Sequence, residues 1–215
     1  MFDDLVCTIC YICLPKKLDV ILQALIDIDV NLFLFLNGIH SPFWDVVFYW
    51  VTSKIFWIPF YLGLFYLTYL KFGWRAFITG IFIALLILIG DRSSVLLFKE
   101  VFERLRPNHN PMLEEIIHYV NGSGGAGKFG FVSSHATNSF ALAVFSSLLL
   151  RSKFKFIVPT MLFWATLVSY SRVYVGVHYP ADLLGGAILG TVVGILVFWI
   201  MKMANQKLNL KLKDV

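Results

Sequence analysis

Long apolar runs separated by short charged segments are the main feature of the sequence. Five runs carry almost no charge and are close to the length of one membrane crossing, about 20 helical residues. We expect each run to form a spanning helix, because a helix satisfies its own backbone hydrogen bonds inside a bilayer. The runs are Ile55–Leu70, Ala76–Gly90, Ala136–Leu150, Ile157–Ser171 and Leu183–Met201.

A sixth apolar segment, Leu18–Leu36, differs from these because it contains several acids. Asp19, Gln23 and Asp27 recur every four residues and would form one polar stripe along a helix. Asp29 lies off that stripe and adds to the cost of burial. The pattern favours an amphipathic helix in the membrane interface over a sixth span.

The composition places this pattern in a membrane protein. Of the 215 residues, 59% are apolar and 14% are charged, and the mean hydropathy is +0.77. A disordered chain, collagen and a water-soluble globule are excluded. We expect an all-α polytopic membrane bundle of about six helices, with five or six spans, over residues 18–204. Residues 1–17 form a segment without an assigned role, and 205–215 form a tail.

The positive charges predict the orientation of the bundle. The formal net charge is +5, but Lys and Arg form no continuous run, so we expect no nucleic-acid partner. Basic residues cluster in 71–75, 151–155 and 202–213. One span separates successive connections, so these clusters share a side, which the positive-inside rule assigns to the cytoplasm. The loop 99–134 and the connection 172–181 then lie on the extracytoplasmic (periplasmic) face of the inner (plasma) membrane.

Ionisable residues gather on this predicted outer side and come from three separate segments. Such groups are costly at a membrane edge and often functional. Snorkelling of flanking residues is the alternative, but it does not explain why the topology brings three segments to one face. The candidates are Lys99 and Arg106, then Ser133, Ser134 and His135, and finally Arg172, His178 and Asp182.

The chemistry of these side chains suits an anionic group. Lys99 and Arg106 are two helical turns apart, which predicts that both project from one helix face. With Arg172 they could surround a phosphate, which would also meet the free N–H groups at a helix N-terminus near residues 133–135. One histidine can attack phosphorus while the other protonates the leaving oxygen. Asp182 follows His178 by four residues and can reach one imidazole nitrogen.

The order and spacing of these residues resemble the type-2 phosphatidate phosphatases, lipid phosphate phosphatases related to vanadium haloperoxidases. That family shows Lys-x6-Arg-Pro, Pro-Ser-Gly-His and Ser-Arg-x5-His-x3-Asp. This chain has Lys99-x6-Arg106-Pro107, Val132-Ser133-Ser134-His135 and Ser171-Arg172-x5-His178-x3-Asp182, and the resemblance runs from about Ala76 to Met201. Val132 and Ser134 replace the family's Pro and Gly, and Ser134 would be strained if its φ had to be positive.

The resemblance implies a role for each matching residue. His178 would be the nucleophile, Asp182 would orient it, and His135 would be the general acid and later the base. The phosphate would be bound by Lys99, Arg106, Ser133, Ser134 and Arg172. The implied reaction uses no metal and no cofactor and proceeds through a phosphohistidine. The implied substrate would be a lipid phosphate or diphosphate of the polyprenyl, phosphatidate, phosphatidylglycerol phosphate or lipid A type; no oligomeric state is implied.

Other functions compete with hydrolysis. A lipid phosphotransferase would pass the phosphoryl group from His178 to another acceptor. An anion transporter would also use buried Arg and Lys, but it needs no paired nucleophile and acid. A haloperoxidase would share the site pattern, although the membrane spans argue against it. Zinc could in principle bind His135, His178 and Asp182, but the nearby cations would repel it.

Two further motifs carry less weight. Gly122-x4-Gly127-Lys128 resembles a P-loop, but Phe129 stands where Ser or Thr should hold magnesium and no strand precedes it, so no nucleotide is expected. Cys7, Cys10 and Cys13 recur every three residues. A fourth cysteine is absent from the sequence, so neither an iron–sulfur cluster nor a complete disulfide framework is predicted.

Overall fold

The computed structural model describes residues 16–120, 122–123 and 127–212. The predicted N-terminal segment is therefore almost entirely outside the described residues, and the three cysteines are outside them too. The described chain is helical, and its strand-like pairing is limited to an isolated bridge between Leu105 and Phe129. Six of the described helices have 15 or more residues, which confirms the all-α prediction of about six helices.

The helices agree with the apolar runs, with some differences at their ends. In chain order they are α2 (Lys16–Asn37), α3 (Pro42–Thr52), α4 (Ile58–Phe72), α5 (Ala76–Ser94), α6 (Glu100–Phe102), α7 (Ser134–Leu150), α8 (Ile157–Tyr174) and α9 (Pro180–Leu208). Single 3₁₀ turns cover Gly73–Arg75 and Pro107–His109, and a π-helical turn, Val95–Lys99, joins α5 to α6. The sequence pattern did not predict α3, although Ser41 caps it and Pro42 occupies its first turn.

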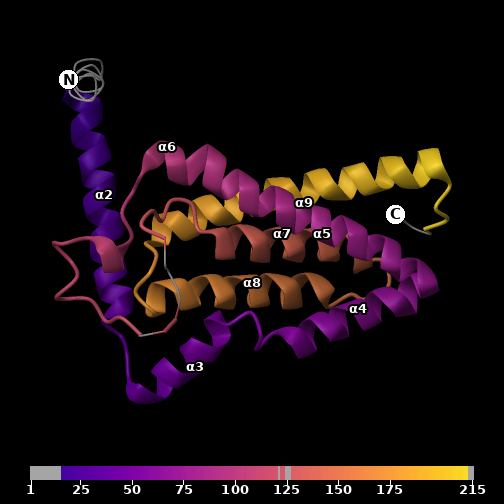
Figure 1. The fold of residues 1–215 in the computed structure, drawn as a ribbon, viewed down its shortest axis with the longest axis horizontal. Helices are drawn as coiled ribbons and strands as arrows, with labels where there is room; N and C mark the ends of the chain where they lie inside the picture. Colours follow the sequence, from indigo (N-terminus) through magenta and orange to yellow (C-terminus); the bar gives the residue numbers. More distant parts are fainter. Residues whose placement is uncertain (1–15, 121, 124–126, 213–215) are drawn as a thin grey trace.

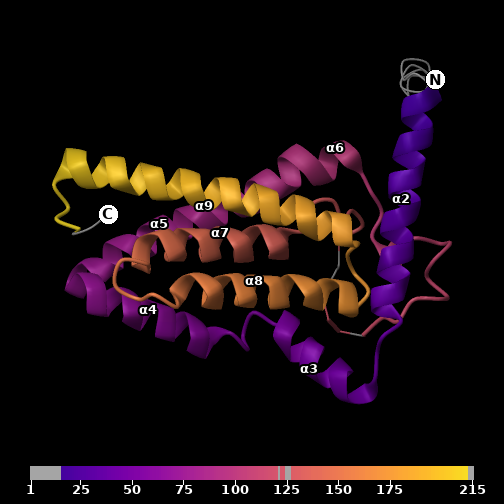
Figure 2. The same ribbon diagram turned by 180° about the vertical axis from the view of Figure 1, so that it is seen from behind.

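Five helices, α4, α5, α7, α8 and α9, run lengthwise through the molecule and alternate in direction (Figure 1). The connections 73–75 and 151–156 and residues 209–212 lie at one end, and 103–120, 127–133 and 175–179 lie at the other. This is the alternation that the basic clusters predicted. In both Figure 1 and Figure 2, α2 crosses the bundle at the end that holds the long loop.

Close packing of α9 against α7 depends on glycines spaced four residues apart. A Cβ added at Gly186 would approach the Ser133 carbonyl oxygen to 2.7 Å, and one at Gly190 would collide with the Thr137 carbonyl. Because these glycines have no side chain, the two backbones come close enough for extensive van der Waals contact, as in small-xxx-small membrane motifs. The packing fixes the start of α7 beside the start of α9.

The face of α2 that docks on the bundle does not include the acids of its polar stripe. Asp29, Phe33 and Asn37, again four residues apart, are buried against the bundle, whereas Asp19 and Asp27 are exposed. The Asn37 amide donates to the carbonyls of His118, Val173 and Tyr174. The polar cost expected of Asp29 is offset, because its carboxylate has partners on the docked face.

The outside of the bundle is suited to lipid. Two stretches are long and apolar enough to cross a membrane: Ile58–Phe102, which includes the reversal at Gly73, and Pro180–Leu208. Large apolar side chains such as Ile81, Phe163 and Ile188 are exposed on α5, α8 and α9. Outward-facing apolar residues of this size on several helices are expected where lipid rather than water surrounds a protein.

Candidate active site

His178 and Asp182 form a buried pair at the start of α9. Nδ1 of His178 lies 3.2 Å from Oδ2 of Asp182, and both side chains are almost completely inaccessible to solvent. The same carboxylate oxygen accepts the backbone N–H of Tyr179 at 3.1 Å, closing a capping box at the helix start. Because Nδ1 is engaged, the chemically available nitrogen of His178 is Nε2.

Arg106 and Arg172 bring positive charge to this pair. Both are buried, at 7% and 2% exposure. Arg106 donates from Nε to the Phe129 carbonyl, while Arg172 donates to Thr52 of α3 and to the Ser123 carbonyl. Neither guanidinium is ion-paired with an acid of the described chain, and Nε of Arg172 has no hydrogen-bond partner there. Buried cations without a counterion form a site for an anion.

Lys99 lies beside the start of α7. Its Nζ donates to the Ser134 hydroxyl at 2.7 Å, and the same hydroxyl contacts the Ser94 hydroxyl at 2.7 Å. Ser134 has no positive φ, so the strain considered for this position does not arise. Ser133 is the N-cap of α7, and its hydroxyl accepts the N–H of Ala136.

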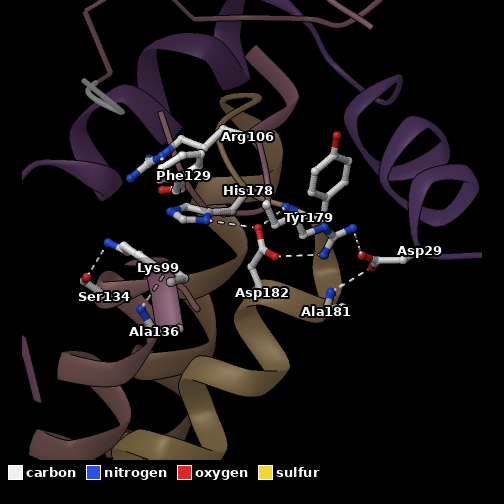
Figure 3. A network of polar contacts seen from close by, with 12 residues as sticks. Asp29, Lys99, Arg106, Phe129, Ser134, Ala136, His178, Tyr179, Ala181 and Asp182 are labelled. Atoms are coloured by element: carbon white, nitrogen blue, oxygen red, sulfur yellow. Dashed lines mark hydrogen bonds and ion pairs between the residues drawn. The ribbon is translucent and has the colours of Figure 1, made fainter. Parts of the chain in front are cut away.

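Lys99 and Arg106 do not project from one helix face, contrary to the expectation from their spacing. The helix ends at Phe102, and Glu103 follows in the left-handed region with φ of 45°. Arg106 is extended because the proline that follows it disfavours helical backbone. In Figure 3, the charged ends of Lys99 and Arg106 nevertheless lie on the same side as the His178 ring nitrogen that is not bonded to Asp182.

The loop before α7 closes over the histidine. A Cβ at Gly130 would be 3.0 Å from Oδ2 of Asp182 and 3.5 Å from Nδ1 of His178. Glycine therefore allows this backbone to lie directly against the pair. Burial lowers the pKa of His178 well below its ordinary range, and the charges of Arg106 and Arg172 lower it further. The neutral imidazole, which is the nucleophilic form, is thereby favoured.

Two more charged residues, Arg104 and Asp29, belong to this network although the sequence interpretation did not include them. Arg104 donates to Oδ1 of Asp182 at 2.9 Å and to Oδ2 of Asp29 at 2.7 Å. These contacts join residues 78 and 75 positions apart in the sequence. A local pattern cannot reveal such pairs; the only available signal was a cation two residues before Arg106 and an acid within an apolar segment.

A cavity of about 520 Å³ lies between α4, α5, α7 and α8 and reaches the site at Ser134 and His135. Its lining is mainly aromatic and aliphatic, and Lys54 and Asp91 add charge to it. The apolar part includes Trp57, Tyr61, Leu64, Phe65, Ile83 and Leu142. An apolar chamber that meets a cationic site has the form needed for a substrate with an anionic head and a hydrocarbon tail.

Comparison with known proteins identifies the family. A model of the PAP2 superfamily matches residues 73–206. The chain belongs to the PAP2 superfamily. The matched range contains all eight candidate site residues. The resemblance drawn from the motifs is therefore confirmed at the level of the family.

Similar proteins in this superfamily include lipid phosphatases. A lipid A 4'-phosphatase of Bacteroides thetaiotaomicron is 40% identical over 87% of this chain and 83% of that protein. A second, from Porphyromonas gingivalis, is 37% identical over 86% and 78%. The crystal structure of a transmembrane PAP2 type phosphatidylglycerolphosphate phosphatase from Bacillus subtilis has the same fold, with a TM-score of 0.63, 23% identity and coverage of 84% of this chain and 87% of that one. This PAP2 protein is a membrane lipid phosphatase.

Proposed function

We propose that this PAP2 phosphatase removes the 4'-phosphate of lipid A through a phosphohistidine at His178. The observation that carries the proposal is the similarity to two lipid A 4'-phosphatases over more than three quarters of each chain. The site is compatible with such a substrate, because buried cations surround the histidine pair and an apolar cavity adjoins it. In this arrangement the phosphate would occupy the cationic site and hydrocarbon would extend into the cavity.

In the first step, Nε2 of His178 attacks phosphorus and forms an N–P bond. The P–O bond to the sugar breaks at the same time, and its electron pair goes to the sugar oxygen. Asp182 stabilises the resulting cationic ring through Nδ1, which is 3.2 Å away. Lys99, Arg106 and Arg172 offset the charge on the phosphoryl oxygens, as preorganised cations do in other phosphoryl transfers.

His135 is the proton carrier in this scheme. It lies in the first turn of α7 and lines the cavity, next to Ser134, which bonds Lys99. The negative charge of a bound phosphate favours a protonated imidazole, which can donate its proton to the leaving sugar oxygen. In the second step, His135 accepts a proton from water as the water oxygen attacks phosphorus. The N–P bond then breaks and inorganic phosphate is released.

The site is proposed to face away from the cytoplasm. The connections that carry the basic clusters 71–75 and 151–155, and the basic residues at the end of α9, lie at the opposite end of the bundle, which the positive-inside rule assigns to the cytoplasm. A cysteine placed at Met112, which is 86% exposed in the loop before α7, should react with an impermeant thiol reagent in intact cells. Labelling only after permeabilisation would place the site in the cytoplasm instead.

Substrate choice can be tested with purified protein in detergent. We expect phosphate release from lipid A carrying 1- and 4'-phosphates to exceed release from phosphatidylglycerophosphate and undecaprenyl diphosphate. Mass spectrometry of the product should locate the loss at the 4' position. Preferential loss of the 1-phosphate, or faster release from either other lipid, would contradict the proposed substrate. Transfer of phosphate to a second lipid instead of to water would favour the phosphotransferase alternative.

Metal dependence gives a separate test of the mechanism. The residues that would have to bind a divalent cation, His135, His178 and Asp182, lie among Arg and Lys side chains that repel one. We expect full activity after dialysis against EDTA. Loss of activity that one added divalent ion restores would favour a metal-activated water in place of the phosphohistidine.

A further inference from the structure

Arg104 connects the acid of the histidine pair to a helix from the other end of the sequence. Its two terminal nitrogens donate to Oδ1 of Asp182, at 2.9 Å, and to Oδ2 of Asp29, at 2.7 Å. The Asp182 side chain is fully buried, and the Asp29 side chain is 9% exposed. Figure 3 shows the resulting chain of contacts from Asp29 of α2 to His178. The fork of one guanidinium therefore holds two buried carboxylates.

The other contacts of these residues fix the geometry of the chain. The Arg104 guanidinium lies 4.1 Å from the centre of the Tyr179 ring, so its plane is supported by an aromatic face. The second oxygen of Asp29 accepts the N–H of Ala181, in the first turn of α9, at 2.8 Å. The carbonyl of Arg104 accepts the N–H of Gly130, whose backbone lies against the histidine pair. Each member is thus held by at least two neighbours.

The charges alternate along this chain of contacts. Asp29 is negative, Arg104 is positive, Asp182 is negative, and the ring of His178 becomes positive when Nε2 is phosphorylated. Arg104 fixes the orientation of the Asp182 carboxylate, but an isolated Arg would also compete with His178 for its negative charge. Asp29 balances that positive charge, so Asp182 remains available to stabilise the cationic ring.

We infer that Arg104 and Asp29 are positioning residues, which orient Asp182 and through it His178, so that docking of α2 completes the catalytic site. This inference rests on the proposed function, in which His178 is the nucleophile. Neither residue touches the phosphate in this scheme. Their removal should therefore slow the chemical step without weakening substrate binding to a similar extent.

The test compares purified variants on lipid A in detergent micelles and on p-nitrophenyl phosphate. For Arg104→Ala and Asp29→Asn we expect kcat to fall about 10- to 100-fold, by analogy with residues that orient metal-binding side chains through one hydrogen bond. KM should change less than about threefold. Arg104→Lys keeps the charge but cannot bridge both carboxylates well, so its kcat should be intermediate. Asp27→Asn is the matched control, because Asp27 is an exposed acid on the same helix, and it should behave as the wild type.

A double-mutant cycle separates positioning from a general effect on the fold. In an Asp182→Asn background, adding Arg104→Ala or Asp29→Asn should lower kcat further by less than about threefold, because the carboxylate that they orient is already gone. Losses that multiply would overturn the inference, as would single variants that fold and turn over like the wild type. Thermal unfolding in detergent gives the fraction of each variant that is folded. An activity loss that is fully explained by a smaller folded fraction would also contradict a positioning role.

One control separates this inference from the proposed mechanism. If His178→Ala remains active, the phosphohistidine mechanism itself fails. If His178→Ala is inactive while both Arg104→Ala and Asp29→Asn keep normal kcat, the mechanism stands and only the positioning role is rejected. If Arg104→Ala does not fold, the isosteric Asp29→Asn decides, because it retains an acceptor for the N–H of Ala181.

Discussion

The two ends of the bundle use the same kind of residue for different purposes. At the end away from α2, Lys71 donates to the Leu149 carbonyl and Lys153 to the Leu70 carbonyl, near the C-termini of α7 and α4. These lysines supply donors to helix ends whose carbonyls lack partners within their own helix. At the other end, Arg106 and Arg172 are buried and have no acid partner among the described residues.

The difference separates cations that bond helix ends from cations that we propose bind the phosphate. A solvated Lys at a helix end costs little to place, so its presence needs no further explanation. A buried guanidinium is expensive, and the cost is not recovered until an anion binds. Burial together with the lack of a counterion, rather than positive charge itself, marks the site. The four predictions below test this contrast, beginning with the largest expected effect.

The largest effect should come from the nucleophile. In the proposed mechanism, His178→Ala removes the nitrogen that forms the N–P bond, so turnover should fall to background and no acid-labile phosphoenzyme should form. Rapid quench with radiolabelled phosphate ester, followed by gel analysis at neutral pH, measures both. His40→Ala is the control, because His40 is exposed and stacks on His118 outside the site. Phosphoenzyme in His178→Ala would show that another residue is the nucleophile.

The next effect should depend on the leaving group. His135→Ala should reduce hydrolysis of a sugar or alkyl lipid phosphate by about 10²- to 10⁴-fold, the usual contribution of general acid catalysis. The loss should be much smaller with p-nitrophenyl phosphate, whose leaving group needs no proton. Phosphohistidine should accumulate with the aryl substrate, since the base that activates water is also missing. Equal losses on both substrates would argue against proton donation by His135.

The buried and exposed cations can then be compared directly. Arg172→Ala should reduce kcat/KM about 10²- to 10³-fold, as expected for loss of one preorganised donor to a developing anion. Arg172→Lys should recover little, because one guanidinium nitrogen of Arg172 already donates to both Thr52 and the Ser123 carbonyl, and a single ammonium in that place would leave no second nitrogen for the phosphate. Lys153→Ala, at the opposite end, should change the rate less than about threefold. Similar losses for Arg172→Ala and Lys153→Ala would remove the distinction between the two ends.

The sequence predicted the bundle well because its signal is local. Each spanning helix is a run of neighbouring apolar residues. His178 and Asp182 are four positions apart, about one helical turn, so their contact can also be predicted from local spacing. The helix α3 was missed because its eleven residues are too few to cross a membrane, and no charged residues separate it from the preceding segment. The break at Glu103 was missed as well, so Lys99 and Arg106 were wrongly placed on one helix face.

Pairing between distant elements could not be predicted in this way. Asp29 was interpreted as a residue whose burial costs free energy, and Arg104 was not considered. The role of each can be recognised only when the two side chains are seen in contact. Their contact depends on the end of α2 docking against α9, which in turn depends on Asn37 and Phe33 finding partners in later segments. The motif residues could be selected by spacing, but the residues that support them required the fold.

The smallest expected effect is a shift in pH dependence. Burial, with Arg106 and Arg172, lowers the pKa of His178 below its ordinary value near 6.5. A nucleophile must be deprotonated, so a lowered pKa keeps His178 active at more acidic pH. The acid limb of kcat/KM that His178 causes should therefore lie below pH 6.5, and Arg106→Gln, which removes one positive charge, should move it to higher pH.

The origin of this shift can be assigned by direct titration. The groups that face His178 are Asp182 of α9, Arg172 of α8, His135 of α7, Lys99, and Arg104 and Arg106 of the loop. Heteronuclear NMR of ¹⁵N-labelled imidazoles in detergent, assigned against His178→Ala, would follow the ring itself. Arg106→Gln should raise its pKa, whereas Lys153→Ala should leave it unchanged because that charge is solvated at the far end. An unchanged titration in Arg106→Gln would mean that burial alone keeps His178 neutral, and the buried cations would then act only on the bound phosphate.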